Sequence, residues 1–217
     1  MKLKVYQDEE SDTLGIGIKI LDDDASLADL LEAWQPLCDD LELIRPYGNG
    51  LHTPCKGCTV NCCNTAYVIP DLIAFKKIAA HLDLSYENFI SNYFHADKVE
   101  HGLLRLKPEP CIFLKNNICT IYPLRTLICR FYLCSPLLPA TEQLIYSITW
   151  TGIAATQLFA LEQGLIKPVA KQGLTSFDQL FINLLDKYRL NPNILLFKDA
   201  QDYDEIPLKP FVLECKV

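Results

Sequence analysis

Four cysteines fall within nine consecutive positions of the chain, and thiols are side chains that can do chemistry. The stretch is CKGCTVNCC, residues 55–63, and its last two thiols are adjacent. Thiols this close together can be disulfide partners, reactive nucleophiles, metal ligands or small apolar groups packed in a core. The rest of the sequence has to discriminate among these four roles.

A second block of cysteines follows about fifty residues further along the chain. The two blocks together supply eight of the ten cysteines: Cys55, Cys58, Cys62, Cys63, Cys111, Cys119, Cys129 and Cys134. Two thiols in a C-x2-C turn can reach one ion, which makes that spacing a common metal-binding knuckle. Because only a folded core can bring two such distant blocks together, we expect metal binding and folding to be coupled.

Composition narrows the class of protein and the partners. The chain has 217 residues, of which 50% are apolar and 22% are charged, as in a packed globular domain. Its net charge is −7, and it has no cluster of lysine and arginine. Binding to phosphates needs a basic face, so we expect no nucleic-acid partner.

The cellular compartment decides among the roles of the thiols. Residues 1–12 lack the apolar segment of a signal peptide, so we expect a cytoplasmic protein. A reducing compartment keeps thiols from pairing as structural disulfides. Clustered cysteines there indicate metal binding or catalysis, and metal binding is our prediction.

One apolar stretch has the length of a membrane span. Residues 143–161 carry no charge over 19 positions. No basic cluster flanks the stretch, and it contains six polar residues: Gln143, Ser147, Thr149, Thr151, Thr156 and Gln157. We therefore predict a buried core helix and no membrane partner.

The spacing inside the first block suggests which of its thiols serve the same metal site. If residues 55–63 are helical, Cys58 and Cys62 lie about 60° and 20° from Cys55 around the helix, so three thiols share one stripe. Cys63 then points about 100° away from Cys62, and in an extended chain the two neighbours face opposite sides. This suggests two metal sites, or one polynuclear cluster with a separate role for the fourth thiol. We expect the three aligned thiols to act on one site with at least one thiol of the second block, and Cys63 to serve a second site or be dispensable.

The donor set limits the choice of metal. Thiolate is a soft ligand, and a set with little histidine or carboxylate points to zinc, copper(I) or iron–sulfur. The second block has apolar neighbours, which suits an iron–sulfur cluster because its potential depends on excluding solvent. The predicted cofactor is an iron–sulfur cluster (4Fe–4S) or iron, with zinc as the alternative. Four thiolates leave a net charge of about −2 on either centre, which Lys56, Arg125 and Arg130 are placed to balance.

The two lone cysteines and the histidines have simpler explanations than metal binding. Cys38 and Cys215 stand alone, and we expect both to be inert, with full metal content after replacement by alanine. His52, three residues before the first block, could complete a site, but loop histidines are usually solvated. The remaining histidines show no ligand spacing: His81, His95 and His101.

Apolar periodicity predicts the elements that position these residues. Helices are expected over residues 22–44, 70–83, 85–96, 123–133, 140–163 and 175–188, with Pro123 in the first turn of the fourth. Strands are expected over residues 14–21, 103–107 and 111–115, with a turn at Asn116–Asn117 and a loop at 45–50. The tail after residue 188 is expected to be rich in loops.

The predicted fold is mainly α with a small irregular β component, a single domain whose helices surround a cysteine-rich metal-binding centre. Residues 1–48 are expected to form an N-terminal strand and helix, and residues 49–136 the cysteine-cluster core. Residues 137–217 are expected to form a helical segment packed on that core, so that the three segments make one compact unit.

The cysteine blocks resemble those of a known family. CKGCTVNCC followed by PCIFLKNNICTIYPLRTLICRFYLC is similar to the YkgJ-type cysteine-cluster family, which is described as a zinc- or iron-chelating domain. The matching positions of the second block are Pro110, Cys111, Phe113, Leu114, Cys119, Ile121, Tyr122, Arg125, Cys129, Arg130 and Cys134. The match covers roughly residues 51–136. Thr126 stands where the family usually has proline, and we expect it to loosen a turn without touching a ligand.

Three functions stay open. The first is a metal-binding protein, in which Tyr122, Arg125 and Arg130 contact the cofactor and balance its charge. The second is an enzyme that uses the cluster in methyl transfer or redox chemistry, with the arginines orienting an anionic substrate. A relative, flagellin lysine methylase, is similar in its cysteine pattern and implies such methyl transfer, although this chain has no glycine-rich S-adenosylmethionine loop. The third is a structural-zinc scaffold whose helical flanks bind a protein partner.

Overall fold

A computed structural model describes residues 2–10, 13–40, 42, 54–59, 62–167 and 174–212 of the chain. The expected loop at 45–50, His52 and Cys215 lie outside these ranges. The strands are β1 (Leu3–Glu10), β2 (Thr13–Ile20), β3 (Leu114–Lys115) and β4 (Ile118–Cys119). The α-helices are α1 (Leu27–Asp39), α3 (Leu72–His81), α4 (Tyr86–Tyr93), α5 (Ala96–Glu100), α6 (Leu127–Phe131), α7 (Pro139–Glu162), α8 (Ser176–Tyr188) and α9 (Ile194–Asp199). Short 3₁₀ turns are η1 (Cys62–Asn64), η2 (Tyr122–Leu124), η3 (Tyr203–Glu205) and η4 (Lys209–Phe211).

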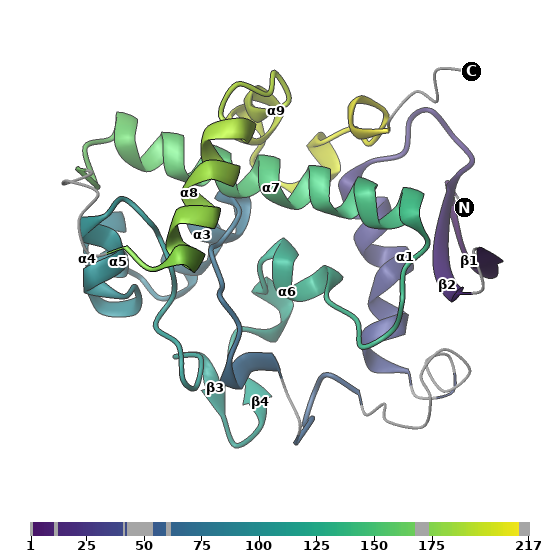
Figure 1. Cartoon of the computed structure of the whole chain (residues 1–217), viewed down its shortest axis with the longest axis horizontal. Helices are drawn as coiled ribbons and strands as arrows, with labels where there is room; N and C mark the ends of the chain where they lie inside the picture. The colour runs from purple at the N-terminus through teal and green to yellow at the C-terminus, as the bar shows by residue number, and fades with distance from the viewer. Residues whose placement is uncertain are drawn as a thin grey trace.

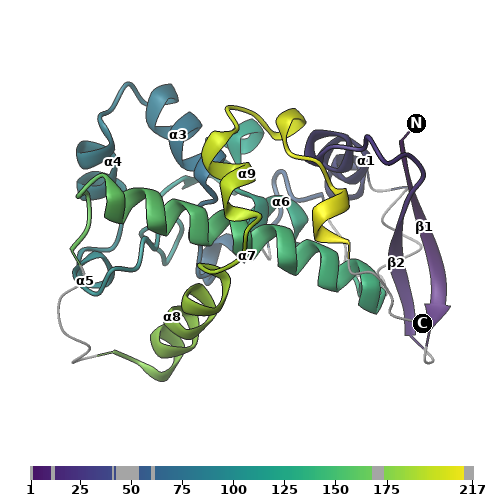
Figure 2. The same cartoon turned by 90° about the horizontal axis from the view of Figure 1, so that it is seen from above.

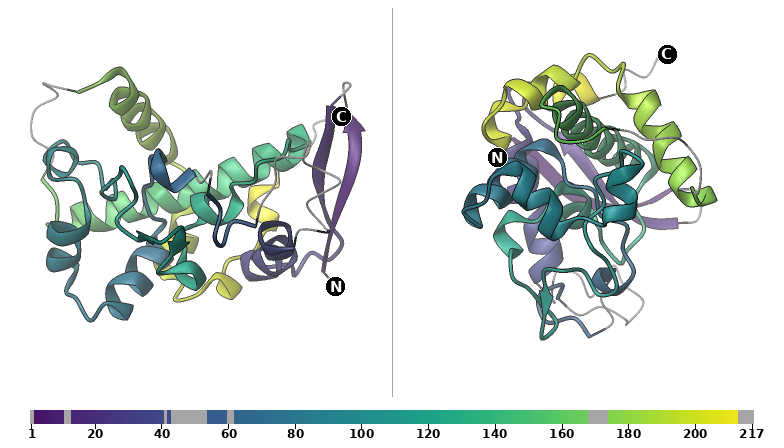
Figure 3. Two further views of the ribbon diagram at one scale, coloured as in Figure 1. Left: turned by 90° about the horizontal axis from the view of Figure 1, so that it is seen from below. Right: turned by 90° about the vertical axis from the view of Figure 1, so that its left-hand side faces the viewer.

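Helix α7 is the central element of the fold. It runs along the molecule with the β1–β2 hairpin at one end and α4 and α5 at the other (Figure 1). Helices α8 and α3 pack on opposite sides of it (Figures 2 and 3). Of its most apolar 18-residue window, 72% is buried inside the protein, so the predicted core helix is confirmed. Gly152 lets the chain pack closely, because a Cβ there would lie 2.8 Å from the Asp71 side chain and 2.9 Å from the Phe197 ring.

The N-terminal hairpin is fixed to the start of α7. Strands β1 and β2 pair antiparallel from Leu3 opposite Ile20 to the turn. Ile16 donates its N–H to the Pro136 carbonyl at 3.0 Å and accepts from the Leu138 N–H at 2.9 Å. One hydrophobic core includes residues from all three expected segments of the chain. The mainly α fold with a small β component is therefore confirmed.

Local sequence signals place most elements correctly. Ser26 caps α1 with a capping box shared with Asp29, and Ser85 caps α4 through the Asn88 N–H. Asn116 and Asn117 have φ of 50° and 59°, the left-handed backbone that a two-residue hairpin turn requires. The predicted turn between residues 111–115 and the following strand is confirmed.

Four expected elements differ from the structure. Of the strand expected over residues 111–115, only Leu114–Lys115 is strand. Residues 123–133 form the turn η2, then two extended residues, then α6, in place of one helix. Residues 103–107 make an isolated bridge between Leu106 and Phe94 and no longer strand. The tail contains α9 and the turns η3 and η4, whose apolar residues Ile194, Phe197 and Phe211 are buried in the core.

Candidate metal centre

All eight predicted ligand cysteines line one cavity of about 80 Å³. The first block approaches it from the turn at residues 55–58 and from η1. The β3–β4 hairpin region brings Cys111 and Cys119, and the α6 region brings Cys129 and Cys134. The hairpin and α6 lie on the same side of α7 (Figure 1). Cys62 and Cys134 are exposed and the other six are half-buried, so the cavity opens to solvent at one side.

Backbone hydrogen bonds join the two blocks directly. The Cys111 N–H donates to the Cys63 carbonyl at 2.7 Å, and the Gly57 N–H donates to the Asn117 carbonyl at 3.1 Å. The Cys55 N–H donates to the Cys38 carbonyl at the end of α1, at 2.9 Å. Gly57 has a φ of 89°, which glycine adopts without strain and which turns the C-x2-C knuckle. The thiols are therefore brought together by the fold itself.

The helical interpretation of the first block is wrong. Within the described residues, a turn at 55–58 and the 3₁₀ turn η1 replace a continuous helix. The argument from one helical stripe therefore does not hold, and Cys63 lies in the same cavity wall as the other three thiols of its block.

Four of the eight thiols interact with one another in every pair, and Cys62 also interacts with two of them, Cys63 and Cys129. Each of these four interacts electrostatically with the other three: Cys63, Cys111, Cys119 and Cys129. We call them the inner quartet. The remaining thiols of the cavity, Cys55, Cys58, Cys62 and Cys134, are called the outer group.

The thiols surround the cavity without meeting at one point. No three cysteine, histidine, aspartate or glutamate side chains in the described part of the chain converge as a site for a single ion. Tetrahedral zinc needs four sulfurs at about 2.3 Å from one centre. The ligands of a polynuclear cluster stand further apart, because each binds a different metal atom. The eight thiols of the cavity are soft donors that fit either kind of centre.

Arg125 supplies a buried positive charge to the cavity wall. Its residue is 7% exposed, its Nε donates to the Tyr122 carbonyl at 3.2 Å, and its guanidinium lies 3.7 Å from the centre of the Tyr122 ring. Its Nη2 is buried and has no hydrogen-bond partner among the described residues. A buried donor without an acceptor is costly. A thiolate or sulfide in the cavity would supply the missing acceptor, so the donor set fits an anionic iron–sulfur cluster.

Of the other two residues predicted to contact the cofactor, one lines the cavity and the other does not. Tyr122 lines the cavity, and its hydroxyl donates to the Asp39 carboxylate at the end of α1. Arg130 does not line the cavity, since its guanidinium lies over the Tyr203 ring at 5.8 Å from the ring centre. Lys56 is exposed and is also absent from the wall. Of the three predicted compensating charges, the structure brings only Arg125 to the cavity.

The thiols differ in how readily they lose a proton. A hydrogen bond from the Cys38 thiol, helped by Arg125, lowers the pKa of Cys55 to about 6. A hydrogen bond from the Cys62 thiol, with the Arg125 charge, lowers the pKa of Cys63 to about 7. Burial raises the pKa of Cys119 to about 11. The metal-free protein therefore presents two thiolates near neutral pH, one in each group.

The order of these thiol pKa values predicts the order in which an alkylating reagent labels the cysteines. In metal-free protein at pH 7, a short pulse of iodoacetamide is expected to label Cys55 and Cys63 first, because the thiolate is the nucleophile. Peptide mass spectrometry gives the order of labelling, and Cys119, half-buried like the other two, is the internal control. Labelling of Cys119 before both of the others would contradict the assignment.

Two features of the site were missed by sequence reasoning. Cys38, expected to be inert, is fully buried and its thiol reaches the Cys55 thiol and the Arg130 carbonyl, the latter at 3.5 Å. Thr126 does not loosen its turn. Its hydroxyl donates to Asp71 Oδ2 at 3.0 Å and accepts from the Asp71 N–H at 3.1 Å, which fixes the turn next to the cavity. Asp71 had a visible helix-capping position before α3, but its contact with residues 126 and 127 has no local signal.

Comparison with family models agrees with the geometry. Residues 54–152 match the model of CxxCxxCC, described as "Putative zinc- or iron-chelating domain". The predicted resemblance is confirmed, and the match continues past residue 136 into α7. No curated protein and no solved structure gave a match.

Proposed function

We propose that this chain is an iron–sulfur protein that holds a 4Fe–4S cluster, because its residues 54–152 match the model of a zinc- or iron-chelating domain and its thiols line one cavity. One observation carries the proposal. Eight thiols and an unpaired buried arginine donor face one largely apolar cavity, and the thiols do not converge on a single-ion site within the described residues.

The inner quartet provides the ligands in this proposal. It has the four thiolates that a 4Fe–4S cluster takes, and both cysteine blocks contribute to it. The Cys63 carbonyl is already bonded to the Cys111 N–H, so two of the four ligands are held together by the backbone. In the outer group, Cys62 and Cys134 are exposed and Cys55 and Cys58 are half-buried, and the group is available as a second set of ligands.

The surroundings do what an iron–sulfur protein requires. Apolar side chains such as Val68, Phe113 and Ile121 form much of the wall and keep water away from the centre. Arg125 places one positive charge beside an assembly with a net charge of about −2 and offers a donor to sulfur. When bound, the cluster would supply one-electron chemistry or Lewis acidity; the residues described here hold and shield it.

The state of the cysteines also supports a proposal for the cellular compartment of the protein. None of the nine cysteines in the described ranges is part of a disulfide bond. We therefore place the protein in a reducing compartment, the cytoplasm, with the metal centre as its partner and no nucleic acid or membrane.

Reconstitution distinguishes the iron–sulfur proposal from zinc. Metal-free protein is incubated without oxygen either with ferrous iron and sulfide or with zinc alone, and each product is freed of excess reagent. We expect a brown protein that retains iron and sulfide in equal amounts, because the thiols suit a cluster. Tight binding of one zinc per chain, with no retention of iron and sulfide, would reject the proposal in favour of a structural-zinc protein.

A further inference from the structure

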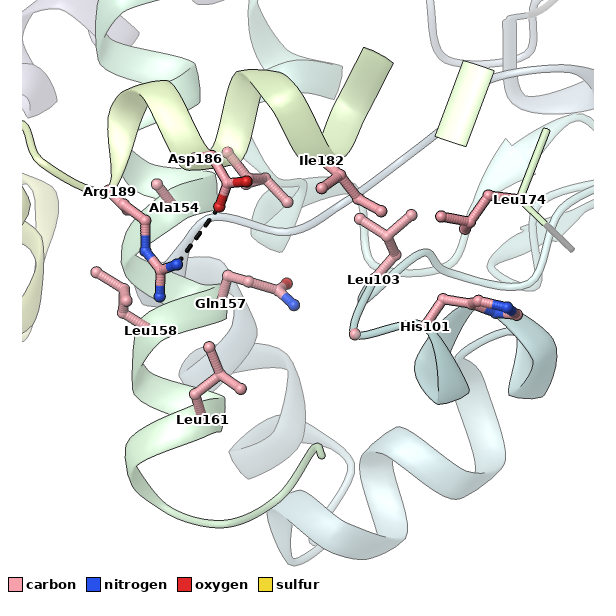
Figure 4. Close-up of a pocket in the computed structure, with 12 residues that line it drawn as sticks. His101, Leu103, Ala154, Gln157, Leu158, Leu161, Leu174, Ile182, Asp186 and Arg189 are labelled. Atoms are coloured by element: carbon pink, nitrogen blue, oxygen red, sulfur yellow. Dashed lines mark hydrogen bonds and ion pairs between the residues drawn. The ribbon is translucent and has the colours of Figure 1, made fainter. Parts of the chain in front are cut away.

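A second cavity, separate from the cysteines, lies between α7, α8 and the turn after α5 (Figure 4). Its volume is about 330 Å³, at the small end of the range for ligand pockets. Leucines at positions 158 and 161 of α7 face Ile182 and Leu185 of α8, and Leu103 closes the third side. None of these residues takes part in the metal centre.

The cavity contains one polar group that lacks a partner. Gln157 is 8% exposed, and its Oε1 is buried and has no hydrogen bond with any part of the chain that the structure describes. Figure 4 shows its amide end pointing from α7 into the cavity. Leaving a buried acceptor unpaired costs free energy, so a group that donates a hydrogen bond here has a ready position.

Charge at the cavity cancels locally. Arg189 and Asp186 stand one helical turn apart on α8, and Nη1 of the arginine lies 3.4 Å from Oδ1 of the aspartate. This paired rim gives no net attraction for a charged ligand. The walls are also fixed in place, because Lys98 of α5 donates to the buried Asp178 of α8 at 2.6 Å.

The cavity is partly open to solvent, and apolar side chains form most of its wall, so water that enters finds few partners there. The polar side chains that line it are His101, Gln157, Asp186 and Arg189, and Gln157 Oε1 is a buried acceptor without a hydrogen bond among the described residues.

We propose that this cavity is a binding site for a small, neutral, mainly apolar molecule that carries one hydroxyl group. The apolar body lies against Leu158, Leu161 and Ile182, and the hydroxyl donates its hydrogen to Gln157 Oε1. The site is independent of the metal centre and does not depend on the identity of the metal.

The test uses a matched pair of probes, 4-phenylbutan-1-ol and its methyl ether, which differ in the hydrogen-bond donor. Titration of the full-length protein is followed by calorimetry or by ligand-observed NMR. We expect the alcohol to bind about tenfold more tightly than the ether, because the ether leaves the buried acceptor unpaired. Equal binding of the two probes, or binding of neither up to their solubility limits, overturns the proposal.

Variants locate the binding. Gln157→Leu keeps a similar volume and is expected to bind both probes equally. Ile182→Trp fills the cavity and is expected to bind neither, whereas Leu180→Trp, on the exposed face of α8, is expected to bind like the wild type. Circular dichroism checks that each variant is folded. If Ile182→Trp does not fold, the test rests on the binding of the two probes to Gln157→Leu. Tighter binding of the alcohol than of the ether by Gln157→Leu would contradict the assignment.

Discussion

Replacing Cys63 by serine is expected to reduce bound metal to less than about one-tenth of the wild-type content and to lower Tm by about 10 °C. Cys63 belongs to the inner quartet, and the metal-binding free energy of such sites is also folding free energy. Cys111→Ser should behave in the same way, since the two residues are joined through the backbone. Metal analysis and thermal unfolding of anaerobically purified variants provide the measurement.

Cys38→Ala is the matched control for the loss of a buried thiol. Cys38 is fully buried in the core and does not line the cavity, and the cavity thiol that it contacts, Cys55, belongs to the outer group and not to the inner quartet. We expect this variant to keep its metal and to lose about 1 kcal/mol of unfolding free energy from poorer packing. Full metal content in Cys63→Ser, or an equal loss of metal in Cys38→Ala, would show that the inner quartet is assigned incorrectly.

Asp71→Ala is expected to lower the free energy of unfolding by about 3–5 kcal/mol. The carboxylate is fully buried and accepts four hydrogen bonds. Oδ1 accepts from the Ala74 N–H and the Tyr203 hydroxyl, at 3.1 and 3.0 Å. Oδ2 accepts from the Thr126 hydroxyl and the Leu127 N–H, at 3.0 and 2.9 Å. One side chain thus joins the starts of α3 and α6 to the tail, and its removal leaves four donors without this partner.

Ser85→Ala provides the comparison for an ordinary helix cap. Ser85 caps α4 through a single bond to the Asn88 N–H at 3.2 Å, so its loss should cost about 1 kcal/mol. Denaturant unfolding measures both variants. Because α6 carries Cys129, Asp71→Ala should also bind less metal, whereas Ser85→Ala should not. Similar losses of stability in the two variants would contradict the role given to Asp71.

Long helices and tight turns are predictable here because their signals are local. The apolar period of α1 and α3 and the serine caps of α1 and α4 lie within each helix or next to it. The two asparagines between β3 and β4 define their turn in the same way. The uncharged run at residues 143–161, within α7, was likewise enough to predict a core helix.

The errors come from contacts between distant residues. The break before α6 depends on Asp71, which is 55 residues from Thr126 in the sequence and captures its hydroxyl. The position of Arg130 depends on Tyr203 in the tail. Neither interaction has a signature in the neighbouring sequence. The sequence therefore could not show which arginine of the second block, Arg125 or Arg130, lies at the cavity.

The candidate site shows the same difference between local signals and contacts of distant residues. Residue type and spacing were enough to select the eight thiols that share the cavity. The grouping of Cys63 with three thiols of the second block was not predictable from helical geometry, because a turn at 55–58 and η1 replace the assumed helix. The backbone bond between Cys111 and Cys63 decides that grouping, and it forms only in the folded chain.

The most direct test is the analysis of iron, zinc and acid-labile sulfide in protein purified without oxygen. A 4Fe–4S cluster in the inner quartet predicts a brown protein with about four irons and four sulfides per chain and little zinc. A colourless protein with zinc and no sulfide, or less than about 0.3 metal per chain under conditions in which thiolates bind tightly, would contradict the account.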